Sequence, residues 1–259
     1  MASAACACQE PIGDAMKQCC ICGGDAFEDR EVLWPALIEE WGLSTEEAAY
    51  INRQQGFTCL SCGGNLRTMV LARALLAAWE GGDVLRDFVA SRRARALDVL
   101  DLNGAAGLGP MLAKLPGYRL ASYPEEDMQA LSFPADSFDA VLHSDTLEHV
   151  PDPVAGLREC RRVLRPGGVM AFTVPIIIGR MTRRRDGLPP SHHGDPSQSG
   201  DDFLVQTEYG ADAWCQVMMA GFDHVTLSGL DFPAAHAISA RRPGAAAKKP
   251  LGLLGRWLG

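Results

Sequence analysis

The chain has 259 residues, of which 47% are hydrophobic and 22% charged, and its formal net charge is −8. This composition predicts a soluble globular protein with enough apolar side chains for a core, and it excludes a chain that is disordered throughout. The negative charge argues against nucleic acid as a partner, because a polyanion would be repelled.

The sequence predicts neither a transmembrane segment nor a secretory leader. The apolar run Val169–Ile178 is about half of the length that spans a bilayer, and Pro175 interrupts it. The first residues, MASAACACQEP, have no basic start and no apolar stretch of signal-peptide length. We therefore expect a cytoplasmic protein whose residues 1–17 form a flexible leader.

Two matching cysteine pairs follow the leader: CCICGG at Cys19–Gly24 and CLSCGG at Cys59–Gly64. Two residues between cysteines let both thiolates face one ion, and the glycines let the chain turn beneath it with N–H groups near the sulfurs. The pairs predict a structural zinc site without an open coordination position, whose ligands are Cys19, Cys22, Cys59 and Cys62. Buried free thiols or a disulfide are the alternative. The remaining cysteines are expected to bind no metal: Cys6, Cys8, Cys20, Cys160 and Cys215.

Helical patterns lie between and after the cysteine pairs. Ser44 or Thr45, followed by Glu47, is typical of a helix N-terminus. Residues 65–82 predict a strong helix that stops at Gly81–Gly82, and residues 83–96 predict another helical stretch. Residues 18–90 are therefore expected to form a zinc-binding and helical module.

From Ala96 onward, short apolar strands alternate with helices, which predicts a mostly parallel α/β sheet with helices on both faces. The predicted strands are Leu97–Leu102, Tyr118–Ser122, Phe138–His143, Val169–Val174 and a late one near His224–Leu227. Helices are predicted at Pro153–Leu164 and near Gly210–Ala220. Residues 91–240 would form this domain. Residues 241–259 would form a flexible basic tail, which either makes a weak membrane or partner contact or is disordered.

Three segments in the second half of the chain carry a family resemblance. LSFPADSFD, then EHV, then RVLRPGG occur in this order within Leu131–Pro175. The series closely resembles the core of class I S-adenosylmethionine-dependent methyltransferases of the type 11-like kind. The double C-x-x-C-G pattern and HHGDP at His192–Pro196 are also similar to a narrower branch of that superfamily. The resemblance implies a Rossmann-like sheet that binds the cofactor at the carboxyl ends of its strands.

The segment DLNGAAGLG, which starts at Asp101, matches the place of the family's glycine-rich loop. By resemblance, Asp101 orders the amino group of the cofactor, and the following turn lets backbone approach its methionine part. The implied contacts are Asp101, Asn103, Gly104, Ala105 and Gly107. The family prefers glycine where this chain has Asn103 and Ala105. Because asparagine tolerates a left-handed conformation and alanine is small, we expect the loop to bind the cofactor still, though more weakly.

The next segment departs further from the family. Ordinary members have a helix and a third strand between the second strand and the adenine-contacting aspartate, whereas YRLASYPEEDMQALSF reaches Asp127 within a few residues. The helix and third strand are therefore expected to be missing or reduced. Glu125 or Glu126 would take the place of the ribose-binding acid, and Asp127 and the Met128 backbone resemble the adenine contact. His143 and Ser144 complete the predicted cofactor contacts.

Methyl transfer to a hydroxyl needs in-line positioning and a base. DTLEHV places Glu148 and His149 just beyond the fourth strand, and His149 is the preferred base, with Glu148 and His193 as further catalytic candidates. A role for His149 in pinning the loop by hydrogen bonds is an equal alternative. The later loop also holds His192 and Asp195. Its arginines, Arg180, Arg183, Arg184 and Arg185, would grip an acidic group of the acceptor or form a solvated face.

The sequence thus predicts an S-adenosylmethionine-dependent methyltransferase with a structural zinc module, acting on a hydroxyl of a small molecule or glycan. A non-catalytic binding or scaffold protein, built on a degenerate form of the same fold, is the leading alternative. A methyltransferase acting on a protein or RNA is the second alternative, and the net charge of −8 argues against RNA.

Overall fold

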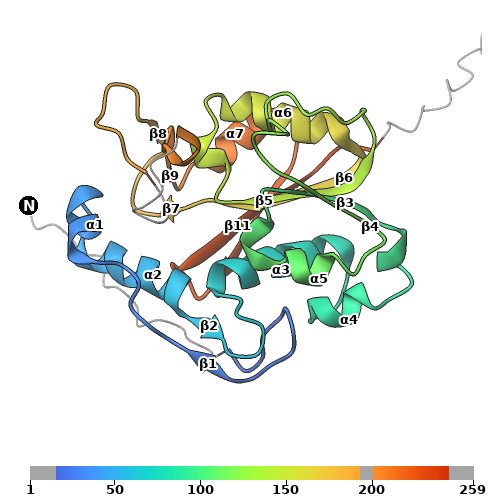
Figure 1. Cartoon of the computed structure of the whole chain (residues 1–259), viewed down its shortest axis with the longest axis horizontal. Coiled ribbons are helices and arrows are strands. Elements are labelled where there is room, and N and C mark those ends of the chain that lie inside the picture. The colour runs from blue at the N-terminus through green and yellow to red at the C-terminus, as the bar shows by residue number, and fades with distance from the viewer. Residues whose placement is uncertain (1–15, 193–200, 245–259) are drawn as a thin grey trace, which may run out of the picture.

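The computed structural model of the chain describes residues 16–192 and 201–244. A six-stranded sheet lies at its centre, in the strand order β10, β11, β6, β5, β3 and β4 (Figure 1). The strands, in that order, are Val225–Leu230, Ala235–Arg241, Leu164–Thr173, Phe138–Ser144, Asp98–Leu102 and Gly117–Ala121. Strands β6, β5, β3 and β4 are parallel to one another. At one side, β11 is antiparallel to β6, and β10 is antiparallel to β11. The mostly parallel sheet confirms the predicted α/β, Rossmann-like fold class.

Helices cover both faces of the sheet (Figure 1). One face carries α6 and α7, at Pro153–Val163 and Trp214–Met219, and the other carries α3, at Leu66–Trp79, with the short α4 and α5, at Leu85–Val89 and Gly109–Leu112. Side chains alternate between the two faces along each strand, so the core is divided into two apolar clusters. On β3 and β5, Leu100 and Val141 pack on the α6 side, whereas Val99 and Leu142 pack on the α3 side.

The connection between β4 and β5 contains no helix and no strand across residues 122–137. This confirms the predicted loss of the second helix and third strand. It leaves β4 as the last strand on its side of the sheet among the described residues.

The N-terminal part packs beneath the α3 face. It contains β1, α1, α2 and β2, at Phe27–Glu28, Pro35–Glu40, Thr45–Gly56 and Thr58–Cys59. The predicted helix start is present as a capping box, because the Ser44 side chain accepts from the backbone N–H of Glu47 and the Glu47 carboxylate accepts from that of Ser44. One apolar cluster includes Cys19 and Cys59 together with α3 and strand residues such as Val99, so the core continues from the cysteine pairs to the sheet.

Several elements were not predicted. Strand β11 lies between β6 and β10, and a small sheet joins β7, β9 and β8, at Ile176–Ile177, Thr207–Gly210 and Arg183–Arg184. The predicted second helical stretch is confined to α4 and a short 3-10 turn at Ala94–Ala96. Among the described residues, none of the helices has the length and hydropathy needed to cross a bilayer. The predicted leader and tail fall mostly outside the described residues.

Candidate functional site

The loop after β3 takes the conformation that a glycine-rich loop would take. Asn103, Gly104 and Gly107 have φ values of 64°, 76° and 79°, so Asn103 is in the left-handed region that the sequence predicted it would tolerate. The Asn103 side chain supports this turn, because its Oδ1 accepts from the backbone N–H of Tyr123 at 2.9 Å. A Cβ added to Gly104 or Gly107 would meet no atom within 4 Å, so both glycines border open space.

Asp101 is completely buried at the end of β3. Its Oδ1 accepts from the backbone N–H of Ala105 at 2.6 Å, and its Oδ2 accepts from the Tyr118 hydroxyl at 2.8 Å. Burial raises the pKa of Asp101, and the two hydrogen bonds oppose that rise. Asp101 therefore closes the turn, and a cofactor amino group would share an oxygen that already has a protein partner.

The predicted ribose and adenine contacts lie in the connection after β4. Glu126 accepts from the backbone N–H of Ser132 at 3.0 Å, and Asp127 accepts from that of Gln129 at 2.8 Å. Met128 is buried against α6, where a Cβ added to Gly156 would lie 3.2 Å from its Cγ. The Met128 side chain thus belongs to the core, which leaves its backbone as the predicted adenine contact.

His143 is fully buried near the end of β5 and stacks on Phe172, with 4.6 Å between the ring centroids. Neither ring nitrogen has a hydrogen-bond partner among the described residues. The neighbouring Ser144 hydroxyl lies 2.6 Å from that of Thr173. Both residues were predicted cofactor contacts, and in this structure each side chain contacts a residue of the neighbouring strand β6.

We expect His143 to make the fold sensitive to acid. Burial lowers the pKa of His143 to about 3, against about 6.5 in an unfolded chain, so the unfolded state binds a proton first as the pH falls. Stability from this group is present above pH 6.5 and declines below it, by up to about 1.4 kcal/mol per pH unit. In urea unfolding between pH 6.5 and 4.5, His143→Leu should show a shallower decline than wild type. Parallel curves would contradict this assignment.

His149 lies in the 3-10 turn Leu147–His149, just beyond β5. Its Nδ1 is 3.1 Å from the backbone oxygen of Leu204, and its Nε2 is 3.8 Å from Oε1 of the buried Glu148. A carbonyl can only accept, so Nδ1 carries the proton in the neutral ring and Nε2 is the basic nitrogen. The structure brings the predicted pair Glu148 and His149 together, whereas His193 and Asp195 lie outside the described residues.

The arginines of the later loop are engaged by acidic and carbonyl groups of the chain. Arg180 pairs with Glu47 at 2.7 Å, and Arg183 pairs with Glu208 at 2.6 Å. Arg185 also pairs with Glu208, and Arg184 donates to the backbone oxygen of Pro151 at 2.7 Å. These contacts favour a structural role for the cluster over a grip on the acceptor.

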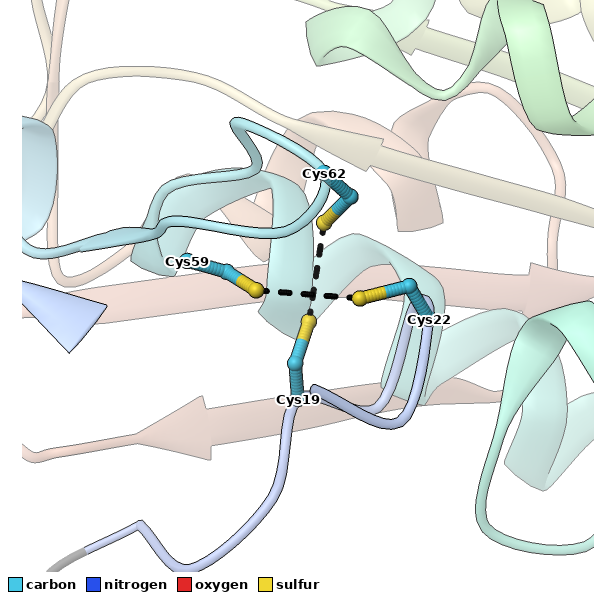
Figure 2. A group of neighbouring side chains, drawn as sticks. All are labelled: Cys19, Cys22, Cys59 and Cys62. Atoms are coloured by element: carbon cyan, nitrogen blue, oxygen red, sulfur yellow. Dashed lines mark hydrogen bonds between the residues drawn. The ribbon is translucent and has the colours of Figure 1, made fainter. Parts of the chain in front are cut away.

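The four predicted metal ligands converge on one point (Figure 2). The Cys19 and Cys62 sulfurs are 3.8 Å apart, those of Cys22 and Cys59 are 3.6 Å apart, and all four sulfurs lie within 4.8 Å of one another. A tetrahedral zinc ion with Zn–S bonds of about 2.3 Å requires sulfur separations of about 3.8 Å. A disulfide requires about 2 Å, so these sulfurs fit a metal and not a disulfide.

The backbone of the two pairs is also matched. Gly23 and Gly63 have φ values of 77° and 73°, and each donates its N–H to the carbonyl of the first cysteine of its pair at 2.8 Å. The backbone N–H of Gly24 points to the Cys22 sulfur at 3.4 Å, as the sequence predicted for such a pair. Burial raises the pKa of the Cys19 thiol to about 11, so a bound cation would be needed to keep this sulfur ionised.

Two residues that contact groups at the carboxyl edge of the sheet were not identified from the sequence. Tyr118 holds Asp101, and the buried Arg67 of α3 pairs with Asp145 in the loop after β5. A buried arginine near the start of an apolar helix cannot be told from a surface residue in the sequence, because its partner is remote along the chain. The only signal in the sequence for the burial of Arg67 was its position next to Leu66 at the start of the predicted helix.

Comparisons with known proteins find similarity in the central part of the chain. Residues 60–172 match the Methyltransf_11 family, described as a methyltransferase domain. A ubiquinone biosynthesis O-methyltransferase of Parvibaculum lavamentivorans is 31% identical over 114 residues, which is 44% of this chain and 38% of that protein. A chloroplastic 2-methyl-6-phytyl-1,4-hydroquinone methyltransferase of Oryza sativa is 42% identical over 52 residues, which is 20% of this chain and 15% of that protein. The matched segments therefore span less than half the length of these curated relatives.

Solved structures include similar chains. A SAM-dependent methyltransferase of Methanosarcina mazei aligns with a TM-score of 0.37 and 16% identity, covering 57% of this chain and 92% of that one. A possible histamine N-methyltransferase of Thermotoga maritima aligns with a TM-score of 0.37 and 13% identity, covering 56% and 82% of the two chains.

Proposed function

We propose that this chain, whose residues 60–172 belong to the methyltransferase domain family, transfers a methyl group from S-adenosylmethionine to a hydroxyl of a small molecule or glycan. The matched segment includes the glycine-containing loop, the connection with Asp127 and the turn with His149. One of the two curated relatives is named a ubiquinone biosynthesis O-methyltransferase, and the other a 2-methyl-6-phytyl-1,4-hydroquinone methyltransferase. Both names support a small-molecule acceptor, and the first supports an oxygen as the methylated atom.

The observation that carries the proposal is the backbone of the loop after β3. Asn103, Gly104 and Gly107 all have positive φ, and the two glycines face open space at the carboxyl end of a parallel strand. In open α/β sheets, ligands bind at this edge, where close backbone approach requires residues with little or no side chain. Asp101, Glu126, Asp127 and the Met128 backbone would hold the amino, ribose and adenine groups. S-adenosylmethionine would supply the activated methyl group.

The four cysteines would hold a structural zinc ion. Their sulfur separations fit tetrahedral coordination, and four thiolates complete the shell without a position for water or substrate. The chemistry of methyl transfer would therefore remain at the sheet edge.

Proton removal from the acceptor is assigned to His149. Its Nδ1 contact with Leu204 fixes the ring with Nε2 as the basic nitrogen, and Nε2 lies 3.8 Å from Oε1 of Glu148. His193, which the sequence analysis named as a further catalytic candidate, is the second candidate for this base.

His149→Ala should leave the affinity for S-adenosylhomocysteine within a few-fold of wild type and lower turnover by about a hundredfold, because the proton acceptor is lost. Calorimetry measures the affinity, and transfer of a labelled methyl group to phenolic acceptors measures turnover. His224→Ala is the matched control, because His224 is an exposed histidine between α7 and β10. Loss of cofactor binding together with a lower melting temperature would instead make His149 a structural pin. Unchanged turnover would show that His149 is not the base and that another group, or no side chain, takes the proton.

A non-catalytic protein on the same fold is the second candidate. Asp101, Glu126 and Asp127 all accept hydrogen bonds from the chain itself, as they would in a domain that no longer binds cofactor. Calorimetric titration with S-adenosylhomocysteine separates the two. Heat and a thermal shift support the enzyme, whereas neither signal at millimolar ligand supports the scaffold. A protein acceptor would be distinguished afterwards by labelling of a lysate.

A further inference from the structure

Arg67 is a buried cation in the second position of α3. Helix α3 begins directly after the second cysteine pair, with Asn65 as its N-cap, whose Oδ1 accepts from the backbone N–H of Thr68 at 3.0 Å. The Cys20 thiol donates to the backbone oxygen of Met69 at 3.2 Å, so the first cysteine pair also contacts this turn. The start of α3, and Arg67 with it, is therefore held in place by both pairs.

The contacts of Arg67 lie away from the cysteine pairs. Its guanidinium forms an ion pair with Asp145 and donates to Oε1 of Gln54 at 3.0 Å. Gln54 is itself buried, and its Nε2 donates to the backbone oxygen of Ala234 at 2.7 Å. An arginine with 8% exposure would lose several kcal/mol of hydration if it were unpaired, so these partners hold it in one geometry.

Asp145 is the first residue after β5, at the edge where the proposed cofactor site lies. Its φ is 49°, an unfavourable value for a residue other than glycine, and its backbone N–H donates to Thr173 at 3.1 Å. The next residue, Thr146, accepts from Nδ2 of Asn103 at 3.4 Å. The ion pair thus connects α3 to a turn that contacts the loop after β3.

We propose that Arg67 and Asp145 are a positioning pair that holds residues 144–146 against the loop of Asn103 and so pre-organises the cofactor site. The guanidinium of Arg67 supplies a charge-assisted contact that stabilises the left-handed Asp145 from outside the turn. The ligand part of this inference rests on the proposed function, whereas the ordering of the turn does not.

Hydrogen–deuterium exchange of the full chain tests the ordering without any ligand. Arg67→Met and Asp145→Asn should each speed exchange of residues 144–150 and 101–107 by about tenfold, and Arg67→Lys should fall between wild type and Arg67→Met. Asp145→Asn alters a partly exposed side chain and therefore serves if Arg67→Met fails to fold. Arg165→Met is the matched control. It removes ion pairs with Asp98 and Asp139 at 2.8 and 2.7 Å, at the opposite edge of the sheet, and should leave both segments unchanged.

Affinity for S-adenosylhomocysteine gives the second measurement. Each single variant should bind about tenfold more weakly, and the double variant no more than about tenfold, because both changes remove the same interaction. A double variant that binds about a hundredfold more weakly than wild type would overturn the proposal, because the two losses of affinity would then be independent. Unchanged hydrogen exchange in both single variants would also overturn it. If wild type binds no ligand while the exchange pattern appears as expected, the proposed function fails and the positioning role stands.

Discussion

Gly107→Val is expected to abolish binding of S-adenosylhomocysteine. Gly107 has a φ of 79°, and a Cβ at this position would enter open space at the carboxyl edge of the sheet, where the proposed ligand lies. A branched side chain would both strain the turn and occupy the volume that the ligand needs. Calorimetry should detect no heat at millimolar ligand, whereas wild type should bind.

Gly167→Val is the matched control for this substitution. Gly167 has a φ of 85° and also meets no atom within 4 Å, but it lies near the start of β6, away from the carboxyl edge. The two variants should therefore suffer a similar backbone strain and a similar drop in melting temperature. Ligand binding should be lost in one and retained in the other. Retention in both would place the ligand away from this loop.

The sequence predicted the strands whose apolar side chains are large and branched. Strand β5, with Val141 and Leu142, was found close to its observed bounds, because such runs between turn signals are typical of buried strands. Strand β11 was missed, since Ala235, Ala237 and Ala240 have little strand preference and lie in a run without a helix or strand period. The small size of Ala235 and Ala237 is instead explained by α3, which packs against this face of the strand.

The candidate site was predictable where its residues lie next to one another in the chain. The left-handed Asn103 and its neighbour Gly104 could be inferred, because their conformation depends on local backbone chemistry. The partners of Asp101 and Arg67 could not be inferred, since Tyr118 and Asp145 approach them only through strand pairing and helix packing. Local patterns thus identified the loop, and remote contacts determine how it is held.

The cysteine set was predictable in full because spacing alone decides it. Cys20 is adjacent to Cys19, but a C-x-x-C pair requires Cys19 with Cys22, and the structure places those two sulfurs in the cluster (Figure 2). The Cys20 thiol points to Met69 in α3, and burial raises its pKa to about 12, so it is an unreactive neighbour.

Cys59→Ser is expected to remove the metal and destabilise the fold. Cys59 and Cys19 are completely buried in the apolar cluster that continues through Leu66 to the sheet, so the binding energy of the ion is also folding energy for this part. A hydroxyl is a far weaker zinc ligand than a thiolate, and the other three sulfurs would be left without a full shell. We expect the melting temperature to fall by about 10 °C, which corresponds to about 3 kcal/mol for a chain of this size.

Elemental analysis and calorimetric melting of the purified chain measure these effects. Wild type should carry one zinc ion per chain, and the variant should carry a small fraction of that amount. Cys20→Ser is the matched control, because it changes a half-buried thiol beside the same pair while leaving the four ligands intact, and a serine hydroxyl can still donate to Met69. It should retain zinc and lose little stability. A wild-type chain without tightly bound metal would contradict the site, and equal zinc loss in both variants would contradict the assignment of Cys59 as a ligand.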